Sequence, residues 1–168
     1  MRYLAIGLLF MMAISSYGQM VLAAPQPAFR DLYWGDPPEK LGESTIFYDK
    51  QLESPGIELR IKVNDDMQLG PLTATAIVYG FFQNRLMFVS ILASDVKMLS
   101  EIAKAKYGLP QQSNMFMIDE LYIRGDTACS VKENIVDKSG YMTLMSTAMA
   151  FEYNRWQQEQ AKEASKAF

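Results

Sequence analysis

The sequence predicts an α+β fold, a single domain in which an antiparallel sheet is packed by two or three helices, after an N-terminal signal peptide. Two observations carry this prediction. Short runs of β-branched and aromatic residues alternate with polar residues and are joined by tight turns, which is typical of antiparallel neighbours. Two longer segments instead repeat apolar residues at helical spacing. Residues 24–168 are enough chain for one hydrophobic core and too few for a second ordinary domain.

The first 23 residues match a secretory signal peptide. Arg2 supplies a positive charge, residues 3–14 form an uncharged apolar run, and small residues precede a cut between Ala23 and Ala24. We therefore expect a periplasmic or secreted protein with no membrane span in the mature chain. The alternative is an uncleaved anchor, because the apolar segment approaches the roughly 20 residues that a bilayer helix needs. Polar residues within the segment and the lack of a basic flank favour cleavage.

The mature chain is expected to begin with a proline-rich leader, residues 24–28, and to continue as the α+β domain over residues 29–146. Residues 29–34 alternate large apolar and polar side chains before Gly35, which predicts a short strand ending at a turn. Asp36 then has the character of a helix N-cap, with proline at the first helical position, so a helix of one or two turns should follow and end at Gly42. A second strand is expected at residues 44–48.

The clearest strand is predicted at residues 57–63, where Ile57, Leu59, Ile61 and Val63 recur at every second position with charged residues between them. This pattern indicates one buried and one solvated face.

A hairpin is predicted next, because the β-branched and aromatic runs at residues 73–82 and 86–93 flank a polar turn at residues 83–85. Ser94 or Asp95 should then cap a helix that extends to about Lys106 and is closed by the glycine and proline that follow.

Three further strands are expected at residues 115–123, 128–136 and 141–145. The C-terminal segment, residues 147–168, is rich in helix formers and becomes polar after Trp156. We expect its first half to dock on the domain and its distal half to project or fray.

The chain resembles small exported bacterial proteins of unassigned function whose mature domain opens with Phe-Arg-x-aliphatic-x-Trp-Gly. Residues 29–35, FRDLYWG, match that opening. Similar proteins continue with an aromatic hairpin, matched by residues 79–86, and with a helix closed by Tyr-Gly-x-Pro, matched by residues 107–110. The resemblance implies an antiparallel sheet covered by helices and supplies no catalytic residue.

Charge and composition exclude several kinds of protein. Removing Arg2 leaves 15 basic and 19 acidic residues, a net charge of −4, and a general nucleic-acid surface would need a basic excess instead. The chain contains no histidine, which removes catalytic triads and the common histidine-based zinc sites. Cys129 is the only cysteine, so no intrachain disulfide forms; a buried small side chain is the simpler interpretation, and a thiol linking two chains is the alternative.

Two weak patterns are compatible with catalysis or metal binding. Ser94 and Lys97 have the Ser-x-x-Lys spacing of serine–lysine acylation chemistry, although an N-cap serine with a solvated lysine is the simpler interpretation. Met115 and Met117 would place two thioethers on one strand face, as Cu(I) prefers, although methionine is also a common core filler. We expect no resident cofactor.

The C-terminal helix carries the candidate partner-binding residues, Phe151, Tyr153 and Trp156, because aromatic anchors beside a polar rim are typical of interfaces. Packing of these rings against the sheet is the alternative. The sequence therefore favours a non-catalytic periplasmic binding or accessory module for a protein or an envelope component. A small hydrolase using carboxylates or the Ser-Lys pair and a small-ligand or Cu(I) carrier stay open as alternatives.

Overall fold

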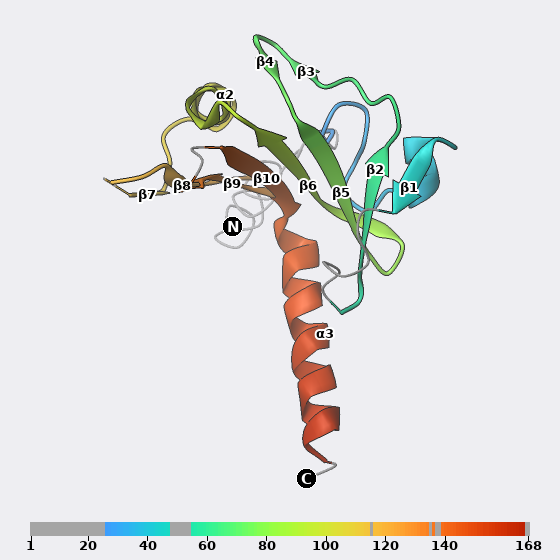
Figure 1. Ribbon diagram of the computed structural model, residues 1–168. Coiled ribbons are helices and arrows are strands. Elements are labelled where there is room, and N and C mark those ends of the chain that lie inside the picture. Colours follow the sequence, from blue (N-terminus) through green and yellow to red (C-terminus); the bar gives the residue numbers. More distant parts are fainter. Residues whose placement is uncertain (1–25, 48–54, 115, 135, 137–138, 167–168) are drawn as a thin grey trace, which may run out of the picture.

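An eight-stranded antiparallel sheet forms the centre of the fold, and two α-helices lie on opposite sides of it (Figure 1). The computed structural model describes residues 26–47, 55–114, 116–134, 136 and 139–166. Within these residues the strand order is β1-β2-β5-β6-β10-β9-β8-β7, and β3 pairs with β4 in a small second sheet. The predicted α+β class and single domain are confirmed. The strands are β1 (Thr45–Phe47), β2 (Ile57–Lys62), β3 (Gln68–Leu69), β4 (Leu72–Thr73), β5 (Ala76–Phe82), β6 (Arg85–Ala93), β7 (Gln112–Ser113), β8 (Asp119–Arg124), β9 (Thr127–Glu133) and β10 (Gly140–Ser146).

The central hairpin forms as expected, with a tighter turn. β5 and β6 are joined by Gln83 and Asn84 alone, whose φ angles of 50° and 62° are those of a type I′ turn. Asparagine tolerates this left-handed conformation, and the turn twists the two strands in the sense that a sheet requires. The single strand expected over residues 73–82 is wrong in one respect, because it is interrupted at Ala74 and Thr75, where the chain leaves β4 to enter β5.

The expected strand at residues 29–34 is wrong. The segment is a tight turn with one isolated bridge between Phe29 and Leu32, and Arg30 adopts a φ of 54°. The alternation in the sequence arises because Phe29 and Leu32 are both buried in the core over the sheet. A turn that buries every third residue and a strand that buries every second one are hard to tell apart over six residues.

The short helix before Gly42 is a 3₁₀ turn, η2 (Pro38–Leu41), and Gly42 closes it as expected. Asp36 is not its N-cap. That position belongs to Pro37, which has no side-chain cap, while the Asp36 carboxylate accepts a hydrogen bond from the Tyr33 amide at 2.9 Å.

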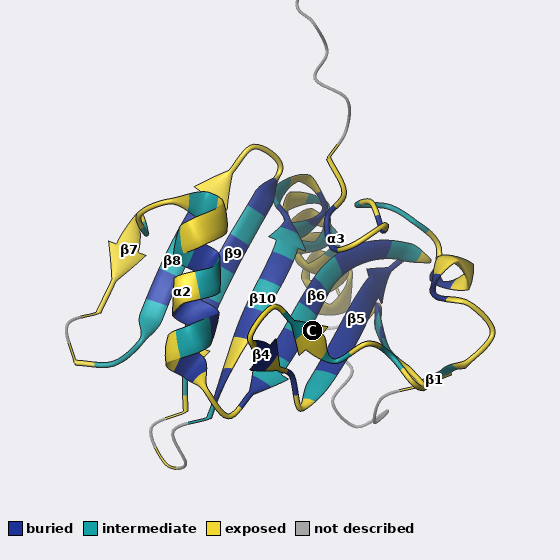
Figure 2. Cartoon of the chain, turned by 90° about the horizontal axis from the view of Figure 1, so that it is seen from above, coloured by how far each residue is buried: buried dark blue, intermediate teal, exposed yellow. Residues whose placement is uncertain are grey.

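The upper face of the sheet is covered by α2 (Val96–Tyr107), which lies over β8, β9 and β10 (Figure 2). Asp95 is its N-cap and accepts a hydrogen bond from the Met98 amide at 3.0 Å, and Gly108 closes its C-terminus. The apolar side of the helix and the buried turn around Phe29 complete the larger of two hydrophobic cores.

The second α-helix, α3 (Thr147–Ser165), starts directly after β10 and projects away from the lower face of the sheet (Figure 1). Viewed from above, it is seen nearly end-on (Figure 2). Its first turns pack against a smaller core beneath β2, β5 and β6, and residues 157–165 are exposed. Only the first half of α3 meets the domain, so neither α2 nor α3 covers much of the lower face.

Candidate functional site: an apolar groove between the sheet and α3

Among the described residues, no helix covers most of the lower face of β6, β10, β9 and β8. Buried residues alternate with half-buried or exposed ones along these strands, and the buried set points toward α2. The strand register places the less buried side chains in cross-strand rows. One row is Asp119, Lys132, Tyr141 and Leu92; the next is Leu121, Ser130, Thr143 and Ser90.

An apolar groove lies where this face meets α3. It has a volume of about 320 Å³, and its lining comes from three strands and the helix. The groove residues are Ile57, Leu59, Met87, Phe88, Met145, Ala150, Tyr153 and Asn154. Apart from Asn154 and the Tyr153 hydroxyl, the groove residues present apolar surface. Ligand sites commonly have this composition, with a few polar groups that orient the ligand.

Gly80 makes room for the aromatic part of the groove. A Cβ atom on Gly80 would lie 2.2 Å from the Phe88 ring, so the ring packs directly on the glycine backbone. The pairing of β5 with β6 is also irregular between Gly80 and Phe81. This bulge places both Met87 and Phe88 in the lower core, where regular alternation would separate them.

Tyr153 and Trp156 fix α3 to the sheet. Their rings stack 5.9 Å apart, and both meet the ring of Phe82 edge-on, at 5.2 and 5.7 Å. The indole lies directly over the backbone of Gly56, and the Tyr153 hydroxyl donates a hydrogen bond to the Pro55 carbonyl at 3.2 Å. Of the two, Tyr153 also lines the groove.

Phe151 lies apart from this pair. It is 71% exposed on another side of α3, so the three aromatic residues do not form one surface. A salt bridge of 2.5 Å between Arg85 and Glu152 adds a polar contact between the hairpin and the helix.

Ser94 and Lys97, the residues that the sequence suggested for catalysis, both line one open hollow of about 490 Å³ at the start of α2. Ser94 and Lys97 are both exposed, and no hydrogen bond joins them within the described residues. Asp95, and not Ser94, caps α2. Both side chains are exposed to solvent, so burial activates neither the serine nor the lysine.

Of the methionine pair predicted for copper, the structure describes only Met117, which is not on a strand. Met115 lies outside the described residues, and Met117 lies in a bend before β8, which starts at Asp119 and not at residue 115 as expected. Among the described residues, no three histidine, cysteine, aspartate or glutamate side chains are grouped to hold a metal ion.

A buried polar cluster that the sequence analysis missed lies beneath α2. Glu120 points into the core, and its Oε2 accepts hydrogen bonds of 2.7 Å from Ser100 and from Tyr122. Lys104 approaches the other carboxylate oxygen at 3.6 Å. Burial, and then the bond to Glu120, raise the pKa of Tyr122 well above its ordinary value. The cluster joins helix to sheet through buried hydrogen bonds, so we assign it a structural role. One signal of it was available, since Glu120 and Tyr122 occupy alternate positions of a strand.

Cys129 lies in the same core and is completely buried. Burial raises the pKa of its thiol to about 12. In this fold the thiol is inaccessible to a second chain, which supports the interpretation of Cys129 as a core residue.

Within the described residues, neither helix has the length and hydrophobicity that crossing a membrane requires. No protein-family model matches the chain, and no curated protein and no solved structure shows significant similarity to it.

Proposed function

We propose that this protein is a non-catalytic binding module that acts in the periplasm or outside the cell and holds an apolar segment of a partner protein in the groove beside α3. The observation that carries the proposal is the groove itself, an apolar hollow of about 320 Å³ that the described residues leave open. Concave, mostly apolar sites with few polar groups are where proteins commonly hold ligands and partner side chains.

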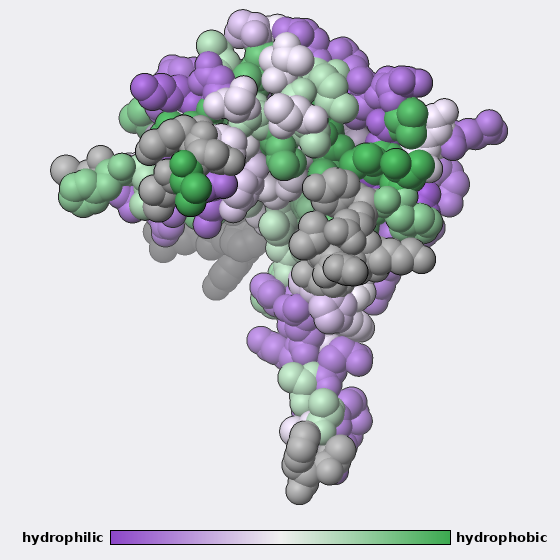
Figure 3. Space-filling model, viewed as in Figure 1, coloured by the Kyte–Doolittle hydropathy of each residue, from purple (hydrophilic) through white to green (hydrophobic). Residues whose placement is uncertain are grey.

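The arrangement around the groove favours a polypeptide as occupant. The described part of α3 from residue 157 onward is exposed and carries mainly glutamine, glutamate and lysine, and Figure 3 shows this projecting helix as largely hydrophilic beside hydrophobic side chains at the sheet. An apolar hollow next to a polar helix matches the core-and-rim anatomy of protein interfaces.

The proposal is tested by selecting peptides from a phage-displayed 12-residue library on the mature protein and measuring their Kd. Ala150→Lys places a long charged side chain in the groove, while alanine-to-lysine exchange suits a helix. Ala161→Lys is the matched control, since Ala161 lies in the exposed part of α3. We expect the selection to yield apolar peptides. Compared with the unaltered protein, their Kd should rise at least tenfold for Ala150→Lys and stay unchanged for Ala161→Lys.

Peptides that bind both variants and the unaltered protein equally would contradict the groove as the site. Export is tested separately, by the intact mass of the protein purified from the cells that make it. A chain starting at Ala24 supports cleavage and export, and a chain that retains residues 1–23 would contradict them.

A further inference from the structure

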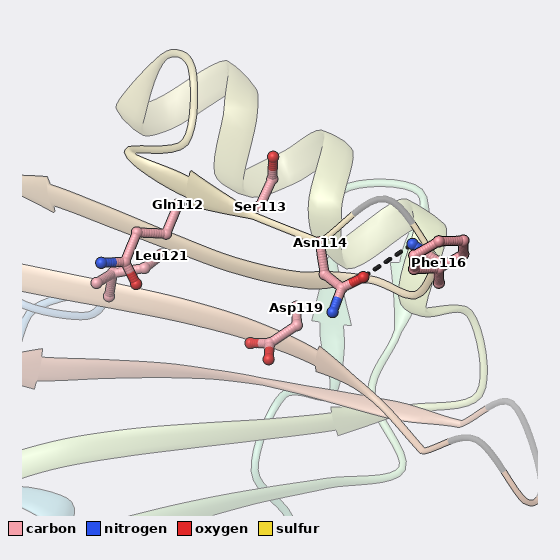
Figure 4. A pocket seen from close by; sticks show the side chains of 6 residues that line it. All are labelled: Gln112, Ser113, Asn114, Phe116, Asp119 and Leu121. Atoms are coloured by element: carbon pink, nitrogen blue, oxygen red, sulfur yellow. Dashed lines mark hydrogen bonds between the residues drawn. The ribbon is translucent and has the colours of Figure 1, made fainter.

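A second hollow lies at the opposite edge of the sheet, where β7 pairs with β8. It has a volume of about 460 Å³ and shares no residue with the groove beside α3. The hollow residues are Gln112, Ser113, Asn114, Phe116, Asp119 and Leu121 (Figure 4). Five of the six are polar or aromatic, so its chemistry differs from that of the groove.

Phe116 provides an aromatic platform. Its side chain is 93% exposed, so it contributes almost nothing to the core. Its position is nevertheless defined, because the Phe116 amide donates a hydrogen bond of 2.8 Å to Oδ1 of Asn114 in an Asx turn. An exposed ring held on a turn offers an apolar face to a ligand.

The polar groups of the hollow are planar and have unused hydrogen-bonding capacity. Because Oδ1 of Asn114 faces the Phe116 amide, the amide nitrogen is left to donate, and no hydrogen bond within the described residues engages the side chain of Gln112. The Asp119 carboxylate accepts, and Lys132 balances its charge at 3.9 Å. Figure 4 shows the Asn114 and Asp119 side chains on the same side of the strands.

The side chains of the hollow together favour one chemical class of ligand. Two amides and a carboxylate provide donors and acceptors side by side, as a ligand rich in hydroxyl groups requires. No arginine or lysine lines the hollow, which disfavours an anion, and a purely apolar ligand would leave the two amides and the carboxylate without hydrogen-bond partners. A pyranose ring has both ring hydroxyls and an apolar face of C–H bonds. We propose that this hollow binds a sugar residue, with the ring of Phe116 against its apolar face and Gln112, Asn114 and Asp119 hydrogen-bonded to its hydroxyls.

The test is a titration followed by NMR of the side-chain amides of Gln112 and Asn114 in the ¹⁵N-labelled mature protein. The probes are chitotetraose, cellotetraose and maltotetraose, with N-acetylglucosamine and glucose as single units. We expect at least one sugar to shift both amides. A tetrasaccharide that binds more tightly than its monosaccharide identifies a polysaccharide as the source, and equal affinities identify a free sugar.

Phe116→Ala should weaken this binding at least tenfold. Leu109→Ala is the matched control, because Leu109 is an equally isolated apolar side chain, 87% exposed, in the loop after α2. Leu109→Ala should leave the Kd unchanged. The proposal is overturned if no probe shifts the two amides, or if Phe116→Ala binds the sugar as tightly as the unaltered protein. Neither result bears on peptide binding in the groove beside α3.

Discussion

Truncation of Trp156 separates its packing role from a role in partner binding. The indole covers Gly56 and meets Phe82 edge-on, and it is half-buried. Loss of a fully buried tryptophan side chain costs about 3–5 kcal/mol. Because part of Trp156 remains in water, we expect Trp156→Ala to lower the free energy of unfolding by about 2–3 kcal/mol. Phe151→Ala, at a position that is 71% exposed, should change it by less than about 0.5 kcal/mol.

Urea unfolding followed by far-UV circular dichroism measures both variants, since this signal does not depend on the tryptophan removed. Hydrogen exchange then locates the effect. If Trp156 fixes α3 to the sheet, the amides of residues 150–156 should exchange about 30- to 150-fold faster in Trp156→Ala, as 2–3 kcal/mol implies. Equal stability of the two variants, or unchanged exchange in α3, would show that Trp156 does not anchor the helix.

Three further predictions concern the core. Gly80→Ala should destabilise the fold by about 1–3 kcal/mol in urea unfolding, because the new methyl would meet the ring of Phe88 at 2.2 Å; unaltered stability would refute the close packing. Cys129, with a pKa raised to about 12, should resist iodoacetamide at pH 8 and react once urea unfolds the chain, and rapid native alkylation, detected by mass, would disprove its burial. Burial raises the pKa of Tyr79 and of Tyr122, whereas tyrosine in the unfolded chain ionises near pH 10. The unfolded state therefore loses protons first, and urea midpoints should fall as the pH rises above about 10; midpoints that stay constant to pH 12 would contradict this.

The sequence was sufficient where local chemistry determines structure. The alternation in β2 correctly predicts that Ile57 and Leu59 are buried, although Ile61 is only half-buried and Val63 is exposed beyond the strand. Asp95 and Gly108 mark the two ends of α2. Prediction from the sequence failed where tertiary contacts determine the local structure. Residues 29–34 alternate as a strand does, yet Phe29 and Leu32 reach the core from a turn. The segment before Asp119 is similarly apolar, and only the pairing with β9 shows where the strand starts.

The candidate sites show the same division. Tyr153 was identified from its place in an aromatic, amphipathic helix, and it does line the groove. The other groove residues, among them Leu59 and Met145, are ordinary strand residues. They come together only because the fold brings β2, β6 and β10 against α3. Phe116 carries no periodic signal at all. Its exposure is visible only in the folded chain.

The two proposed sites should act independently, and this can be measured. The groove is lined by β2, β6, β10 and α3, and the hollow by β7 and β8. Between Met145 on β10, the groove strand nearest to the hollow, and Leu121 on β8 lies one strand, β9. At about 4.8 Å between neighbouring strands, the strands that carry them are roughly 10 Å apart. Substitutions at such separation, without shared partners, usually add within about 0.5 kcal/mol.

The double variant Ala150→Lys with Phe116→Ala should therefore bind peptide as Ala150→Lys does and sugar as Phe116→Ala does, each Kd within about 2.5-fold of the single variant's value. A larger deviation would mean that the open sheet face couples the two ends. Its cross-strand rows, which include the hydrogen bond of 2.8 Å between the Ser90 and Thr143 hydroxyls, would then be the path to examine. Additivity would instead establish a module that holds two chemically distinct ligands at once on a single sheet.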